Sequence, residues 1–170
     1  MNEQDSSPIL SDYLLKPGFI YLADKPVSIS TVLGSSVSVC LFDKKQKIGG
    51  MNHFQFSEIR EKDKSTPIYG NVATLTLIRM MLLNGSKDRH LEAQIFGGAH
   101  NPLVSDINVG INNINTARLI LNSRKIKIVS EDVGGEVGRK IIFNTSTCEI
   151  AVLKVKKLRQ SDWYPYKSDR

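Results

Sequence analysis

The pattern that decides the fold lies in Thr31-Val-Leu-Gly-Ser-Ser-Val-Ser-Val-Cys-Leu-Phe-Asp43 and in Gly49-Gly-Met-Asn-His-Phe54, which follows soon after. After Gly34, apolar side chains alternate with serines and a cysteine. This period of two residues is typical of a β-strand that presents different side chains to its two faces. A polar turn over residues 43–46 leads into a second run, residues 48–56, so the two runs together predict a β-hairpin.

Pairing across this hairpin brings a serine and a histidine together. With the turn centred on residues 44–45, Ser36 lies directly opposite His53. Directly opposed Cβ atoms are about 4.5–5.5 Å apart, which suits a nucleophile and its general base. A bulge at Gly49-Gly50 would shift this register. Taken alone, the pair favours a plainer interpretation, because serines beside glycine turns and histidines on strands are usually structural.

The two cysteines are expected to be structural. Cys40 lies in the first strand of the hairpin, where a small buried core residue is the simplest interpretation, and Cys148 lies in a later hairpin. Two cysteines do not make a disulfide framework. Neither has a metal-ligand spacing with a histidine, so no metal site is expected.

The rest of the chain predicts further strands and two helices. Strands are expected over residues 19–23, 27–33, 91–96 and 126–129, with a hairpin that pairs 139–143 with 148–155. One helix is expected over 72–83 with Asn71 as its N-cap, and another from Asn112 or Asn113. The inner face of this second helix would carry Ile114, Ala117, Ile120 and Leu121. Many strands with two substantial helices predict an α/β (α+β) layered sandwich of mixed sheet.

Length and composition fit one domain with a core of its own. The chain has 170 residues, of which 41% are hydrophobic and 24% charged. The polar N-terminus shows no secretory signal, and the apolar runs fall short of the ~20 residues of a membrane span. We therefore expect a cytoplasmic protein with no membrane insertion.

Much of the net charge of +6 lies in the C-terminal tail. From Lys154 to Arg170 there are six basic residues and two acidic ones, with Trp163, Tyr164 and Tyr166 among them. Such a tail could dock on an acidic partner or stack on single-stranded nucleic acid. No recognisable nucleic-acid motif supports that role, so we expect the aromatics to fold back onto the domain and no nucleic acid to be bound.

The hairpin and several later motifs together resemble the CheD family, the chemoreceptor glutamine deamidases of bacterial chemotaxis. The later motifs are Tyr69-Gly-Asn-Val-Ala73, Gly97-Gly-Ala99, Val109-Gly-Ile-Asn-Asn113, Glu131-Asp-Val-Gly-Gly135 and Gly138-Arg139. They occur in the family's order and span a core of about residues 15–155. The segments 1–14 and 156–170 lie outside the resemblance, within a single domain of residues 1–170.

The resemblance implies a fold of sheet layers covered by helices on one side, and a reaction. In the family a cysteine stands at the position of Ser36, and the histidine at the position of His53 is its base. A threonine ahead of the nucleophile orients the histidine, and Ser30 or Thr31 fills that place here. The thiolate attacks a receptor glutamine, ammonia leaves, and water releases glutamate, with no cofactor or metal.

The serine at position 36 decides what this form can do. A serine hydroxyl demands a more fully organised base and oxyanion site than a thiol, so the resemblance implies a Cys-to-Ser form with little or no activity, natural or engineered. The substrates would be methyl-accepting chemotaxis receptors, and the CheC phosphatase is a further family partner. The alternative is a non-catalytic module that binds receptors or CheC. A serine hydrolase is disfavoured because Gly34-Ser-Ser36 lacks the strand–elbow–helix context.

Overall fold

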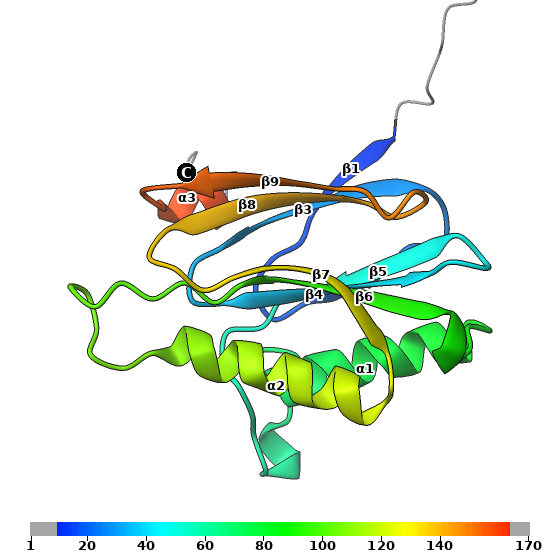
Figure 1. Cartoon of the computed structure of the whole chain (residues 1–170), viewed down its shortest axis with the longest axis horizontal. Coiled ribbons are helices and arrows are strands. Elements are labelled where there is room, and N and C mark those ends of the chain that lie inside the picture. The colour runs from blue at the N-terminus through cyan, green and yellow to red at the C-terminus, as the bar shows by residue number, and fades with distance from the viewer. Residues whose placement is uncertain (1–9, 164–170) are drawn as a thin grey trace, which may run out of the picture.

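Two β-sheets stack face to face, and two long helices cover the outer face of one of them (Figure 1). The computed structural model describes residues 10–163. Sheet A has the strand order β1-β3-β8-β9, and sheet B has the order β2-β5-β4-β6-β7. Both sheets are mixed, since β1 pairs with β3 and β6 with β7 in parallel, while the other pairs are antiparallel. The predicted layered α+β sandwich is confirmed.

Most predicted strands are present with small changes of boundary. In chain order they are β1 Ser11–Leu14, β2 Ile20–Leu22, β3 Val27–Leu33, β4 Val37–Asp43, β5 Ile48–Asn52, β6 Leu91–Gly97, β7 Lys127–Val133, β8 Gly138–Asn144 and β9 Ile150–Val155. Strand β1 lies in the polar N-terminal segment that the sequence placed outside the core. It extends sheet A by pairing with β3.

Strand β4 is central because it buries side chains on both faces. Val37, Val39 and Leu41 belong to the apolar layer between sheet B and the helices. Cys40, from the other face, belongs to the layer between the two sheets. The period of two in the sequence thus reflects two cores, one on each side of the strand.

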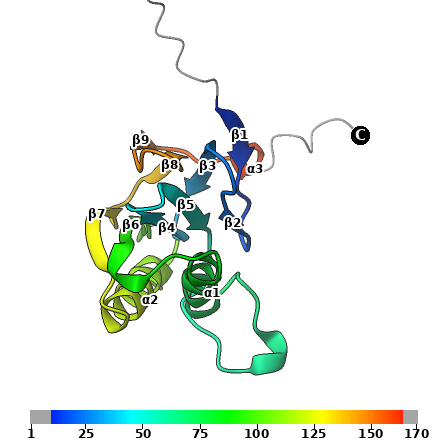
Figure 2. The same cartoon turned by 90° about the vertical axis from the view of Figure 1, so that its right-hand side faces the viewer.

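Helices α1 (Gly70–Leu83) and α2 (Val109–Ser123) lie side by side on sheet B, opposite sheet A (Figures 1 and 2). Both begin earlier than predicted. The N-cap of α1 is Tyr69 and not Asn71. The side chain of Asn71 is not available as a cap, because it forms hydrogen bonds with the backbone N–H and carbonyl of Ile59. The cap of α2 is Asn108, whose side chain accepts from the Ile111 N–H.

Short helical turns occupy two connections and the segment after the last described strand. They are η1 (Lys62–Lys64), within the expected loop, η2 (Asp88–His90) before β6, and α3 (Gln160–Trp163) after β9. None of the helices in residues 10–163 is long and apolar enough to cross a bilayer.

The hairpin of β4 and β5 forms in a register two residues away from the predicted one. Cys40 pairs with Met51, and beyond the strand ends Val37 pairs with Phe54. The Asp43 carboxylate accepts from the Lys45 and Gln46 N–H groups, and Lys47 adopts a φ of 58°. These interactions build a loop over residues 44–47 instead of a turn centred on 44–45. Ser36 and His53 are therefore not directly opposed, and that prediction was wrong.

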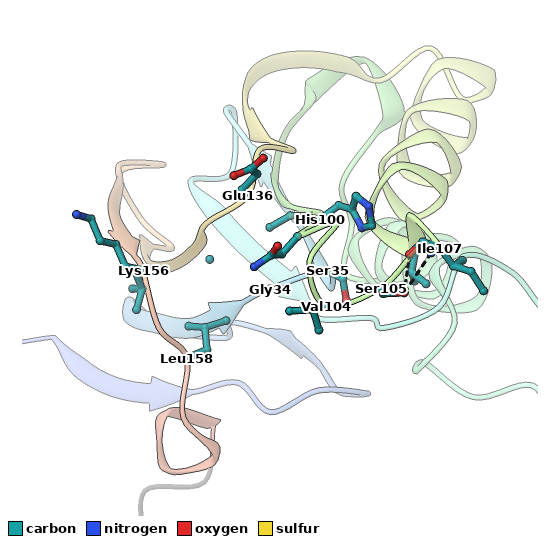
Figure 3. A pocket seen from close by; sticks show the side chains of 14 residues that line it. Gly34, Ser35, His100, Val104, Ser105, Ile107, Glu136, Lys156 and Leu158 are labelled. Atoms are coloured by element: carbon teal, nitrogen blue, oxygen red, sulfur yellow. Dashed lines mark hydrogen bonds between the residues drawn. The ribbon is translucent and has the colours of Figure 1, made fainter.

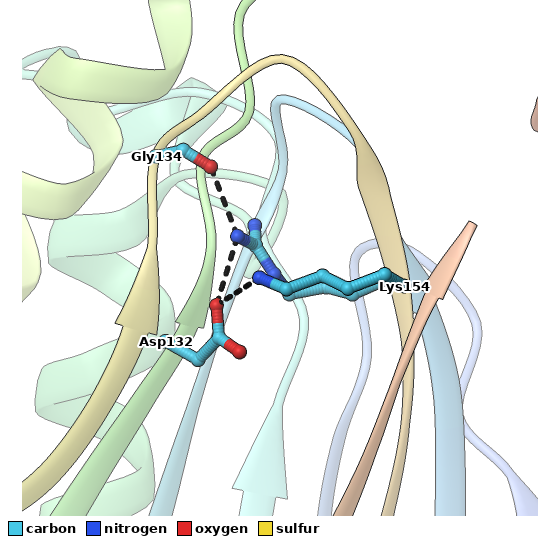
Figure 4. Close-up of polar contacts among 4 residues, drawn as sticks. Asp132, Gly134 and Lys154 are labelled. Atoms are coloured by element: carbon cyan, nitrogen blue, oxygen red, sulfur yellow. Dashed lines mark hydrogen bonds and ion pairs between the residues drawn. The ribbon is translucent and has the colours of Figure 1, made fainter. Parts of the chain in front are cut away.

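Arg139 of β8 is buried and ties the two sheets together at one end through Asp132 and Gly134, which Figure 4 labels. Arg139 of β8 donates from Nη2 to the Asp132 carboxylate at 3.0 Å and to the Gly134 carbonyl at 2.9 Å. Lys154 of β9 donates to the same carboxylate. Burial alone would raise the pKa of Asp132, but the hydrogen bonds and charges of Lys154 and Arg139 outweigh it and lower that pKa. The Asp132 carboxylate of sheet B thus pairs with two cations of sheet A, Arg139 and Lys154.

Candidate active site

Ser36 lies where the chain crosses from β3 of sheet A to β4 of sheet B. Its side chain is only 7% exposed and lines a cavity of about 320 Å³. The other walls are Gly34, Ser35, Gln55, Phe56, Val109 and Trp163. Ligand pockets are typically about 300–1,000 Å³, so this cavity suits one side chain of a larger substrate.

His53 lies behind Ser36 and is fully buried. Its Nε2 is 2.9 Å from Ser36 Oγ, and its Nδ1 is 2.8 Å from Thr31 Oγ1. The two hydroxyls therefore bracket the ring from opposite edges. The structure brings together the serine, the histidine and one of the two predicted hydroxyl residues.

The bonding of Thr31 fixes the tautomer of the histidine. The Thr31 hydroxyl donates its one proton to the Leu15 carbonyl at 2.7 Å, so it can only accept from the ring. His53 Nδ1 must then carry the hydrogen, and Nε2 keeps a free lone pair toward Ser36. An imidazole in this state is ready to take a proton from the residue at position 36.

Burial keeps the imidazole neutral. It lowers the pKa of His53 to about 4, and the nearby Leu15 carbonyl opposes this shift only in part. The ring is thus in its basic form at neutral pH.

Ser30 takes no part in this arrangement. Neighbouring residues of a strand point to opposite faces, and Ser30 lines a separate pocket with Asp12 and Lys140. Of the two hydroxyls that the sequence left open, the geometry favours Thr31 as the partner of the histidine.

Two glycines allow backbone segments to close around Ser36. A Cβ on Gly97, which has a φ of 105°, would lie 2.2 Å from the Ser36 carbonyl oxygen. A Cβ on Gly110 would lie 2.2 Å from the carbonyl oxygen of Gly98. The first turn of α2 can therefore pack directly on the turn that follows β6, which brings Val109 to the cavity.

A second, larger cavity of about 520 Å³ adjoins the first (Figure 3). The two share Gly34, Ser35 and Val109. Figure 3 shows His100 and Glu136 on its rim, with Lys156 and Leu158 contributed by the chain after β9. A ligand that reached Ser36 could thus extend past Ser35 into this space.

The remaining candidates are structural. Cys40 is buried, and desolvation, with a smaller contribution from Cys148, raises the pKa of its thiol well above the ordinary value. Burial also raises the pKa of Cys148. Both thiols are therefore poor nucleophiles. No group of three or more acidic, histidine or cysteine side chains within residues 10–163 could hold a metal ion.

Comparison with known proteins decides the family. The model of the family described as CheD chemotactic sensory transduction matches residues 54–154. The chain belongs to the CheD family. A relative from Trichlorobacter lovleyi is 40% identical over 94% of this chain and 100% of its own length. Relatives from Methylobacillus flagellatus (38% over 85% of this chain and 74% of the relative) and Sulfurimonas denitrificans (39% over 81% and 90%) are also similar. All three are named "Probable chemoreceptor glutamine deamidase CheD".

Sequence reasoning missed two parts of this CheD site. The Leu15 carbonyl, which orients Thr31, comes from an apolar residue after β1 and carries no sequence signal. Trp163 forms part of the cavity wall, and its indole N–H donates to the Val32 carbonyl at 2.7 Å. The tail was expected to fold back, which is confirmed for Trp163, while Tyr164 and Tyr166 lie outside the described residues.

Proposed function

We propose that this protein is built for the deamidation of glutamine side chains on chemoreceptors, and that Ser36 leaves it with little or no activity. The observation that carries the proposal is the hydrogen-bonded series Leu15–Thr31–His53–Ser36 at the wall of a cavity. Such a series orients a neutral base toward a nucleophile, which is the arrangement that covalent hydrolysis of an amide requires.

In the proposed reaction, the atom at position 36 attacks the carbon of the glutamine carboxamide while its proton passes to His53 Nε2. The carbonyl oxygen becomes an oxyanion. When the carbon–nitrogen bond breaks, the histidine returns the proton to the nitrogen and ammonia leaves. A water then attacks the acyl carbon, again losing a proton to the histidine. The bond to position 36 breaks, the nucleophile takes the proton back, and glutamate is released.

The acidity of the nucleophile explains why a serine is expected to fail. A thiol has a pKa of about 8.5, so proton transfer to a histidine of pKa about 4 is uphill by roughly 6 kcal/mol before the new ion pair is stabilised. A hydroxyl is far less acidic, so the same transfer costs much more. Thr31 is a neutral hydroxyl, so it offers no negative charge to stabilise the imidazolium that this transfer forms.

The proposed substrates are glutamines on the cytoplasmic helices of methyl-accepting receptors. The names of the relatives support the coarser part of this proposal, a glutamine of a chemoreceptor. The cavity at Ser36 is open to a side chain that projects from a helix, and Phe56 on its rim is 49% exposed. A cytoplasmic location and binding of the CheC phosphatase belong to the same proposal.

The test compares the protein with its Ser36→Cys variant on the cytoplasmic domain of a chemoreceptor. Ammonia release and conversion of glutamine to glutamate by the variant alone would support the proposal. If neither form reacts and both bind the receptor tightly, the protein is a binding module instead of a deamidase.

A further inference from the structure

We propose that Asn113 is a positioning residue for this reaction, and that it holds the Ser35–Ser36 peptide so that the Ser36 N–H faces the carboxamide oxygen of the substrate. The proposal rests on the deamidase function above and adds the groups that stabilise its oxyanion. It is carried by the bonds of one fully buried side chain and by one backbone N–H that has no acceptor in the described part of the chain.

Asn113 lies at the point where the pairing between β4 and the segment that follows β5 ends. The last backbone pair between the two segments joins Val37 and Phe54. Beyond it, the Gln55 N–H turns away to the Ile68 carbonyl. The amide nitrogen of Asn113, from α2, enters the opening and donates to the Ser35 carbonyl at 3.0 Å and to the Gln55 carbonyl at 2.9 Å. One side chain thus joins the two segments that carry the cavity walls.

The orientation of this amide is fixed by its partners. Both neighbours are carbonyl oxygens, which only accept, so the NH₂ group and not the oxygen must face them. The Asn113 oxygen has no partner within the described part of the chain, although it is fully buried. Buried polar atoms are normally paired, so the fold tolerates an unfavourable feature at this position to keep the two donated bonds.

The second observation concerns the backbone N–H of Ser36. Ser36 lies opposite Gly98, one step beyond the Val37–Gly97 pair. In an antiparallel ladder the two residues of a hydrogen-bonded pair exchange both N–H···O bonds. The Gly98 N–H does donate to the Ser36 carbonyl at 2.8 Å. Gly98 has a φ of 71°, and its own carbonyl is turned against Gly110 of α2. The return bond is therefore missing, and the Ser36 N–H has no acceptor among residues 10–163.

These two features act on one peptide group. The peptide is planar, so the Ser35 carbonyl and the Ser36 N–H point in opposite directions. Asn113 fixes the carbonyl end, and this sets the direction of the N–H end beside the nucleophile. A hydrogen bond accepted by the carbonyl also polarises the peptide and strengthens its N–H as a donor. Such a preorganised donor is what a tetrahedral intermediate requires.

The test uses the full chain with Ser36→Cys, alone and combined with Asn113→Ala or Asn113→Asp. Deamidation of a receptor cytoplasmic domain measures the complete reaction. The rate at which iodoacetamide alkylates the new thiol depends on the thiol and on His53, but not on an oxyanion site, because displacement of iodide forms no oxyanion. The matched control is Thr145→Val, which removes a buried hydroxyl that makes two hydrogen bonds to the backbone of Val27, away from the cavity.

We expect both Asn113 variants to lower kcat for deamidation by roughly tenfold to a hundredfold, with KM and the alkylation rate changed by less than about threefold. The Thr145→Val protein should keep its kcat. Unchanged kcat in both Asn113 variants would overturn the proposal, as would an alkylation rate that falls as far as kcat, since Asn113 would then only maintain the fold. If Ser36→Cys alone releases no ammonia, the proposed function fails, and this proposal fails with it.

Discussion

Thr31 Oγ1 lies 2.8 Å from His53 Nδ1. Thr31 belongs to β3 of sheet A, whereas His53 directly follows β5 of sheet B, so one sheet orients a base that the other sheet carries. The site therefore depends on how the two sheets are stacked, and not only on the hairpin that carries Ser36 and His53. Contacts that tie the sheets together should affect the site, even at a distance from it.

Replacement of the threonine tests the orientation of the base. In the Ser36→Cys background, Thr31→Val removes the acceptor for the Nδ1 hydrogen and leaves the shape almost unchanged. We expect kcat for deamidation to fall by roughly tenfold to a hundredfold, because part of the general-base contribution is lost. Nitrogen NMR of the ring should show the tautomers becoming mixed. Ser30→Ala is the control, and an equal loss of kcat there would contradict the assignment of Thr31.

The buried histidine should make stability depend on pH. Its pKa is about 4 in the folded protein and about 6.5 in the unfolded chain, so the unfolded state binds the proton more tightly. The free energy of unfolding should have its full value above about pH 6.5 and decrease as the pH falls toward 4, by about 3 kcal/mol in total.

Urea unfolding between pH 4 and 7 measures this dependence. The His53→Gln variant should lose most of it, whereas His90→Gln, in η2, should keep it. A slope that is the same in all three proteins would show that His53 is not the group responsible.

The arginine between the sheets gives a prediction for stability. Arg139 is 1% exposed, and Asp132→Asn would leave its charge without a carboxylate. Since Asp132 itself is partly exposed, we expect a loss of about 2 kcal/mol in the free energy of unfolding, less than for a wholly buried pair.

The neighbouring residue supplies the control. Glu131 pairs with Arg118 at the surface, and surface pairs are worth less than about 1 kcal/mol, so Glu131→Gln should have a small effect. Equal losses in the two variants, measured by chemical denaturation, would contradict the role assigned to Arg139.

The C-terminal segment should limit access to position 36. Trp163 lines the small cavity, and Leu158 packs against Gly34 and Gly138. In the Ser36→Cys background, Trp163→Ala should raise the rate of alkylation by iodoacetamide several-fold, since the cavity loses a wall. Leu153→Ala, at an exposed position of β9, serves as control. An alkylation rate that stays the same after loss of the indole would contradict this role.

The sequence predicted the faces of the hairpin better than its register. The alternation of Val37 and Val39 with Ser36 and Ser38 placed each side chain on its correct face. The register depended on the turn, where the Asp43 carboxylate and the positive φ of Lys47 favour a four-residue loop. An error of two residues leaves every side chain on the same face, so Ser36 and His53 still meet, as diagonal neighbours.

Features that depend on tertiary contacts were harder to predict. Asn71 has the character of a helix cap, but its amide is used by the loop at Ile59. Strand β1 is polar and exposed, so only its pairing with β3 reveals it. Asn113 was visible in the sequence as the last residue of the motif Val109-Gly-Ile-Asn-Asn113, yet its two bonds to distant carbonyls could not be predicted from the motif.

The most direct test of the central claim compares three proteins on one receptor cytoplasmic domain: the present chain, Ser36→Cys, and Ser36→Cys combined with His53→Gln. Mass spectrometry of receptor peptides would measure conversion of glutamine to glutamate. We predict conversion by Ser36→Cys only, because the thiol and its base are both required. Conversion by the double variant, or by none of the three, would contradict the account.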